Sequence, residues 1–413
     1  MKNFTSVLDR HLRNVKIFKP ASVSGREIRA GDETKTTVEI QIISTVVLKG
    51  FSIFCRFEMN ENCQNPSKPW LHWFAVLTAL TTFLLIGLGG LVTSHEAGMS
   101  VPDWPTTYGY NMFFFPISKW VGGVFYEHTH RLLASAVGFL TTLLAIWLWV
   151  KDPRKWMHWL GLAAFLLVVA QGILGGLRVR ENMAVLGIFH GAVGQSFLAL
   201  TCAIALFTSR RWIDFTPRQS DFVPHGLRSH VLWVTVLIFG QLLLGATMRH
   251  QRAGLAIHDF PLAYHQIWPN TGADAVARYN AEWSDMVGAQ PVTAFQIILQ
   301  MVHRLIALAI FLGVAAAAGL SVKKLGGRDL LAKLALVWAG LIMVQIGLGA
   351  WTIWSNKAAD IATAHVMVGA LSLVLGVVWC LIACRRSPSL TEIATGTTIS
   401  AAFGTASMPS TNK

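Results

Sequence analysis

One stretch of this chain occurs twice: it reads LGGLVTSHEAGMSVPDWP at Leu88–Pro105 and LGATMRHQRAGLAIHDFP at Leu244–Pro261. Each copy closes a long apolar segment and opens a more polar one. Further matched segments follow in the same order: EHTHR (Glu127–Arg131) with QMVHR (Gln300–Arg304), QGILGG from Gln171 with QIGLGA from Gln345, and FHGAVG from Phe189 with AHVMVG from Ala364. The pattern predicts that the chain is two copies of one structural unit.

The composition indicates a membrane protein. Of 413 residues, 53% are hydrophobic and 13% are charged, whereas soluble domains average about 25% charged residues. A soluble helical protein cannot hide so many helices that are apolar all round. Eight segments are long and apolar enough to cross a bilayer: Trp70–Val92, His128–Val150, Trp156–Val179, Ala184–Thr208, Leu227–Met248, Phe295–Val322, Leu330–Trp354 and Ile361–Cys384.

The predicted fold is therefore an all-α polytopic membrane protein with eight transmembrane helices, arranged as two tandem four-helix bundles. Because four is an even number, both bundles have the same orientation, and a pseudo-twofold axis along the membrane normal should relate them. The predicted divisions are an N-terminal extension, disordered or a mis-assigned start (1–69), a first unit (70–210), a linker (211–226), a second unit (227–386) and a disordered tail (387–413).

The formal net charge of +13 has a topological explanation. Most Lys and Arg residues near span ends fall on one side of the membrane, and such residues favour the cytoplasmic side. We therefore expect both termini in the cytoplasm of a bacterial cell with the chain in its inner membrane, or in the matrix if the protein is mitochondrial. The bilayer, and not a nucleic acid, is the partner that this charge distribution predicts.

Four histidines lie near the predicted outer ends of spans, and the repeat pairs His130 with His303 and His190 with His365. A polar side chain within a bilayer indicates a functional site, although one histidine alone would more often bond a neighbouring helix. Four at equal depth favour metal ligation. Two facing neutral imidazoles suit the axial positions of haem iron, whereas zinc or copper would need a third ligand, and none repeats.

Charged residues beside these histidines have two readings each. Arg131 and Arg304 are candidates to bind haem propionates, or else anchors at the membrane interface. Glu127 is a candidate general base, one helical turn from His130, or else the structural partner of Arg131 in a surface pair worth about 0.3–0.5 kcal/mol. Asp103, His95 and His128 lie in the same outer region.

On GGLVTSHEAGMSVPDWP, EHTHR, GIFHGAVGQ, QMVHR and ATAHVMVG, the chain resembles the haem A synthases, and most closely their bacterial form. The resemblance covers Trp70 to about Cys384. It implies successive hydroxylations that oxidise the C8 methyl group of haem O to a formyl group, giving haem A for terminal oxidases. It also implies a haem O synthase as the supplier of haem O, and an electron acceptor that the sequence does not identify.

The resemblance further assigns roles to the histidines. It implies one resident b-type haem held by His303 and His365, and haem O as substrate between His130 and His190. Glu127 matches the acidic residue that the family requires. Some members carry two cysteines in the first outer loop, but residues 93–126 contain none, so a thiol-dependent step in that loop is excluded.

Two other functions remain open at this point. The first is a di-haem membrane cytochrome with bis-histidine ligation that carries electrons from quinol. The second is a haem transporter or chaperone. The pigments of the purified protein would separate these possibilities, since only a synthase should contain haem O or haem A beside haem b.

Overall fold

The computed structural model describes residues 68–181, 183–216, 221–283 and 291–386. All eight predicted spans are helices there: α3 (Pro69–Ser94), α4 (Gly123–Lys151), α5 (Lys155–Glu181), α6 (Ala184–Phe207), α8 (His225–His250), α10 (Ala294–Leu325), α11 (Leu330–Trp354) and α12 (Ala359–Arg385). The fold is thus all-helical, as predicted. The predicted tail, and the extension up to residue 67, lie outside the described residues.

The outer surfaces of these helices are suited to lipid. Each of the eight has the length and the apolar composition needed to cross a membrane. Large apolar side chains project outward along them, for example Phe139, which is 64% exposed. Exposed tryptophans lie near helix ends, for example Trp73 on α3 and Trp354 on α11. Tryptophan rings at such positions favour the membrane interface. The chain is a multi-pass membrane protein.

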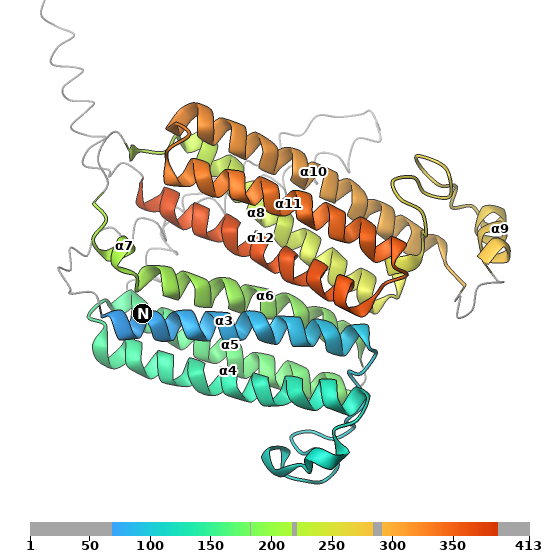
Figure 1. Ribbon diagram of the computed structural model, residues 1–413, viewed down its shortest axis with the longest axis horizontal. Helices are drawn as coiled ribbons and strands as arrows, with labels where there is room; N and C mark the ends of the chain where they lie inside the picture. Colours follow the sequence, from blue (N-terminus) through green and yellow to red (C-terminus); the bar gives the residue numbers. More distant parts are fainter. Residues whose placement is uncertain (1–67, 182, 217–220, 284–290, 387–413) are drawn as a thin grey trace, which may run out of the picture. The chain divides into compact units, whose positions relative to one another are not determined.

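The contacts among the helices can be described for the first and the second half of the chain in turn, as two sets (Figure 1). Helix α3 contacts α4 and α6, and α5 contacts the same two helices. In the second set, α10 and α12 each contact both α8 and α11. Contacts between the sets join α3 with α12, α6 with α8, and α6 with α12. We refer to these inter-set contacts as the seam.

Small residues allow the helices of the seam to approach closely. A Cβ atom added to Gly87 would lie 2.9 Å from the sulfur of Met367, and one added to Gly90 would lie 2.8 Å from Cγ2 of Thr363. Both glycines are on α3, and both neighbours are on α12. At Gly90 a side chain would press on the stiff, β-branched Thr363 and push the helices apart, whereas at Gly87 the flexible Met367 would have to shift.

Two long connections lie at the same end of the helices, which we call the loop end: residues 95–122, and the described parts of the second connection, 251–283 and 291–293. The first contains the 3₁₀ turns η1 (Met112–Phe114) and η2 (Ile117–Lys119). The second is longer and contains η4 (Ala253–Leu255) and α9 (Ala273–Trp283). A short helix, α7 (Arg210–Ile213), begins at the last residue of the predicted first unit and continues into the predicted linker.

The repeated segments of the two connections fold alike. Each contains a cis peptide bond before proline, at Trp104–Pro105 and Phe260–Pro261. Each then makes a tight turn closed by an isolated β-bridge, Thr107 to Tyr110 in the first and Ala263 to Gln266 in the second. The sequence repeat therefore extends to the conformation of the loops, which cover the helix ends that carry the candidate residues.

Candidate functional site

The four predicted histidines occur in two neighbouring pairs. All four lie about two helical turns from the loop end: His130 on α4, His190 on α6, His303 on α10 and His365 on α12. His130 and His190 are close enough to interact electrostatically, and so are His303 and His365. Among the described residues, no cluster of three or more His, Cys, Asp or Glu side chains forms a metal-binding group. The histidines are therefore arranged in twos.

A glycine of a neighbouring helix lies against each imidazole. An added Cβ would be 3.1 Å from Cε1 of His130 at Gly89, and 3.4 Å from Cε1 of His190 at Gly175. In the second set the distances are 3.4 Å from Gly245 to His303 and 3.1 Å from Gly349 to His365. The repeat pairs these glycines as it pairs the histidines. Each ring thus lies against bare backbone, and at Gly89 and Gly349 an added Cβ would be close enough to make the ring shift.

The Nδ1 atoms of these four histidines are buried without a hydrogen-bond partner in the described part of the chain. Other histidines of the helices do have partners. His72 lies 3.0 Å from the carbonyl oxygen of Ala205, and His230 lies 2.8 Å from that of Gly313. Buried polar atoms without partners are rare and call for a functional explanation. Bis-histidine ligation of a haem fits these residues, because paired neutral imidazoles are suitable axial ligands for its iron.

Two glutamines extend the site beyond the residues that were predicted. The amide nitrogen of Gln345 lies 3.5 Å from Nε2 of His365. Gln171 is the repeat-matched residue on α5, and its amide nitrogen is buried and unpartnered. The sequence did contain a signal for them, since both glutamines interrupt apolar spans at matched positions.

Glu127 lies on α4 and holds the first connection against this helix. It is 4% exposed, one carboxylate oxygen accepts a 2.8 Å bond from the backbone N–H of Val101, and the other accepts a 2.8 Å bond from Arg131. The side chains of this ion pair are only 5% and 10% exposed. The alternative interpretation placed the Glu127–Arg131 pair at the surface. That location is wrong, because the pair is buried beneath the loop.

Gln300 makes the equivalent bond in the second half. Its amide oxygen accepts a 2.7 Å bond from the N–H of Ile257, and its amide nitrogen donates to the carbonyl of the same residue at 3.2 Å. Because Gln300 is neutral, it cannot form an ion pair with Arg304 like the one that Glu127 forms with Arg131. The two halves thus share the loop contact and differ in charge.

Arg131 and Arg304 anchor the loops through backbone carbonyls. Arg131 donates to the carbonyl oxygens of Val101, Asp103 and Thr106 at 2.7–3.0 Å, as well as to Glu127. Arg304 donates to Asp259 and Leu262 at 2.8 Å. A guanidinium has five N–H donors, and those of Arg131 are largely used. The structure thus adds a role in holding the loops, while the propionate role and the anchoring at the membrane interface both stay predictions.

The other polar candidates belong to the loop. Asp103 accepts bonds from the N–H groups of Tyr108 and Gly109. Burial alone would raise the pKa of the Asp103 carboxyl, but these bonds and one from Thr106 hold the pKa below its ordinary value. His128 is fully buried between Phe115 and Trp120.

His95 stacks on Tyr126 at a centroid distance of 4.2 Å. Asp103, His95 and His128 therefore have partners within the loop region, and none of them joins the His130–His190 pair. Met301, the counterpart of His128, also packs in an apolar cluster under its own loop, so both positions serve loop packing.

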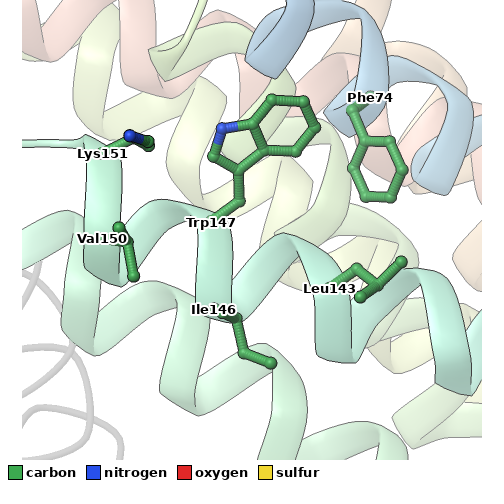
Figure 2. A pocket seen from close by; sticks show the side chains of 6 residues that line it. All are labelled: Phe74, Leu143, Ile146, Trp147, Val150 and Lys151. Carbon is green, nitrogen blue, oxygen red and sulfur yellow. The ribbon is translucent and has the colours of Figure 1, made fainter.

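An apolar groove lies away from the histidines, between α3 and α4 (Figure 2). Its volume is about 320 Å³, and it is lined by Phe74, Leu143, Ile146, Trp147, Val150 and Lys151. The lining includes the last residues of α4, which are at the end opposite the long loops. With one ammonium group and no histidine or carboxylate in its lining, this groove does not belong to the candidate site.

Comparison with known proteins gives a consistent match to the same region. A family model described as cytochrome oxidase assembly protein, COX15-CtaA, matches residues 72–377. A protein of Alkalihalophilus pseudofirmus named Heme A synthase is 28% identical over 212 residues, which cover 50% of this chain and 68% of that protein. One of Bacillus cereus with the same name is 32% identical over 201 residues, covering 47% of this chain and 61% of the relative.

Proposed function

The chain belongs to the COX15-CtaA family, and from this premise we propose that it is a haem A synthase, an oxidoreductase that converts the C8 methyl group of haem O to a formyl group. The observation that carries the proposal is the set of four repeat-matched histidines, each against a glycine and each with a buried, unpartnered Nδ1. The matched region contains all four. The names of the relatives agree with this activity.

We assign different tasks to the two histidine pairs. His303 and His365 hold one resident b-type haem, and His130 and His190 hold haem O. When bound, the resident haem supplies the redox chemistry that amino-acid side chains lack. Glu127 supports this division, because it puts a carboxylate one helical turn from His130, where the second half has the neutral Gln300.

The protein's own residues then have defined tasks. The imidazoles bind and orient the two macrocycles, and the facing glycines leave room for rings close to the backbone. Arg131 and Arg304 hold the loops over the helix ends, which limits the access of water. Glu127 accepts a proton as the methyl group is oxidised, as a positioned carboxylate can.

The architecture we propose is two tandem four-helix units related by a pseudo-twofold axis along the membrane normal. The seam supports it, because the contact of α3 with α12 and that of α8 with α6 are equivalent under the repeat. We place the loop end outside and both termini in the cytoplasm, in a bacterial inner membrane. The excess of Lys and Arg at the other end supports that orientation. A haem O synthase and an electron acceptor are the proposed partners.

The test is pigment analysis combined with conversion. The full chain is purified from membranes, its pigments are extracted and separated, and membranes that contain it are incubated with haem O. Haem A formed in these membranes, and not in membranes without the chain, is the expected result. Two molecules of haem b per chain and no product would indicate an electron carrier instead. Haem O bound and released unchanged would indicate a transporter.

A further expectation concerns the glycine that faces His365. Gly349→Val should displace the imidazole, since even a Cβ would lie 3.1 Å from Cε1, and the affinity for the resident haem should fall by at least about tenfold. Gly347→Val is the matched control, because Gly347 lies on the same helix and faces open space. Haem per chain after purification is the measurement. Equal haem content in both variants would show that the close approach is not needed.

A further inference from the structure

Arg178 is a cation near the substrate histidines that the mechanism above does not use. It lies in the last turn of α5, half-buried. Its guanidinium lies over Gly98 of the first connection, where an added Cβ would be 2.7 Å from Nη2. In the described part of the chain no carbonyl or carboxylate accepts a hydrogen bond from it, whereas Arg131 has four such acceptors.

Arg249 brings a second cation to the same place from the other half. It is in the last turn of α8 and reaches across the seam to α3, where it donates to the carbonyl of Gly90 at 2.7 Å and to the hydroxyl of Ser94. Arg249 and Arg178 interact electrostatically, and Arg178 interacts with His190 in the same way. The loop end of the first set thus gathers two guanidinium groups beside one histidine of the substrate pair.

Within the described structure, no free carboxylate balances the positive charge of Arg178 and Arg249. Glu127 lies within electrostatic range of Arg178, but its carboxylate is already bonded to Arg131 and Val101. Half-buried charges are stable only when they are paired or solvated. The arrangement therefore leaves an excess of positive charge near the first histidine pair, which an anionic ligand would neutralise.

Two simpler explanations account for only part of the placement of Arg178 and Arg249. A basic residue in the last turn is favoured by the helix dipole, and exposed Arg180 fits that explanation, but Arg178 is turned inward onto the loop. Arg249 ties the seam together through α3, whereas Arg178 forms no such bond. The second half also lacks this residue: the repeat places Thr352 there, whose hydroxyl donates to Leu348 of its own helix, and the side chain nearest Gly254 is that of exposed Lys357.

We propose that Arg178, with Arg249 beside it, binds the carboxylate groups of the haem substrate and so fixes its orientation between His130 and His190. The inference rests on the proposed function and deepens it by adding a binding site for the two acidic side arms of the macrocycle. Guanidinium groups suit this task because they bind carboxylates through two parallel hydrogen bonds.

The test compares haem O with its dimethyl ester, which lacks the negative charges. Binding of each is measured by absorbance titration of the purified full chain, without turnover. The wild-type chain should prefer the acid by about 10- to 100-fold, as expected for charge-assisted hydrogen bonds. Arg178→Met should lose that preference by weakening acid binding alone, Arg178→Lys should keep part of it, and the control Arg180→Met should keep it all.

The possible failures can be told apart. Equal loss of acid and ester binding in Arg178→Met, with helix content unchanged by circular dichroism, would mean a structural role and overturn the inference. A wild-type preference that survives in Arg178→Met would also overturn it. A wild-type chain that binds neither form would instead contradict the proposed function itself.

Discussion

His303→Ala and His365→Ala are each expected to abolish the spectrum of the resident b-type haem. Partners that merely orient metal ligands contribute about 10- to 100-fold in affinity, and removal of a ligand itself should cost at least the upper end of that range. The buried Nδ1 of each ring has no protein partner in the described structure, and the one side-chain contact of His365 there is with the Gln345 amide at 3.5 Å. Absorbance spectra and haem content of the purified variants are the measurements.

The matching substitutions in the first half provide the contrast. His130→Ala and His190→Ala should keep most of the b-type spectrum and stop the conversion of haem O. His230→Ala is a control for histidine removal as such, because His230 already bonds the carbonyl of Gly313, and it should retain both the haem and the activity. If all four site variants lost the b-type spectrum equally, the division of labour between the halves would be refuted.

Glu127→Gln is expected to leave a folded, haem-containing and nearly inert protein. Gln300 shows that an amide at this position can accept the loop N–H bond, so the first connection should stay in place. Arg131 would lose its charged partner but keep three carbonyl acceptors, and the loss of stability should be about 1–3 kcal/mol. Without a proton acceptor, conversion should fall by about 10²- to 10⁴-fold.

The structural alternative makes a different prediction that can be measured on the same samples. If Glu127 only positions Arg131, then Arg131→Met should reduce conversion as much as Glu127→Gln does, and the double variant should be no worse than either. Conversion rates and thermal unfolding of the three variants decide this. Turnover close to the wild-type rate in Glu127→Gln would leave the carboxylate as a loop anchor and remove it from the chemistry.

The spans and the histidine pairs could be predicted from the sequence because each has a local signal. Apolar length gives the helices, and the repeat at fixed offsets gives residues of equal depth, so His130 and His303 stand out without coordinates. The glycines facing them were visible only as small residues common in membrane helices. Which glycine faces which imidazole depends on how neighbouring helices are rotated, and no pattern within one helix determines this.

The roles of the arginines could not be predicted for a related reason. Arg131 and Arg304 bind backbone carbonyls of a folded loop, and carbonyl positions leave no trace in the residue types. The same holds for Arg178, which the sequence presents only as a basic residue at a span end. Its contact with Gly98 arises from the way the first connection packs against α5.

The seam also bears on how the two halves came to differ. In a dimer of identical four-helix subunits, every mutation would appear at both sites at once. A substitution that improved one site would therefore also change the other, even where the change was harmful. Joining the copies in one gene removes that constraint while the same helices continue to meet across α3, α6, α8 and α12. Glu127 and Gln300, or Arg178 and Thr352, can then differ between the halves, and this is the freedom that the proposed division of tasks between the two sites requires.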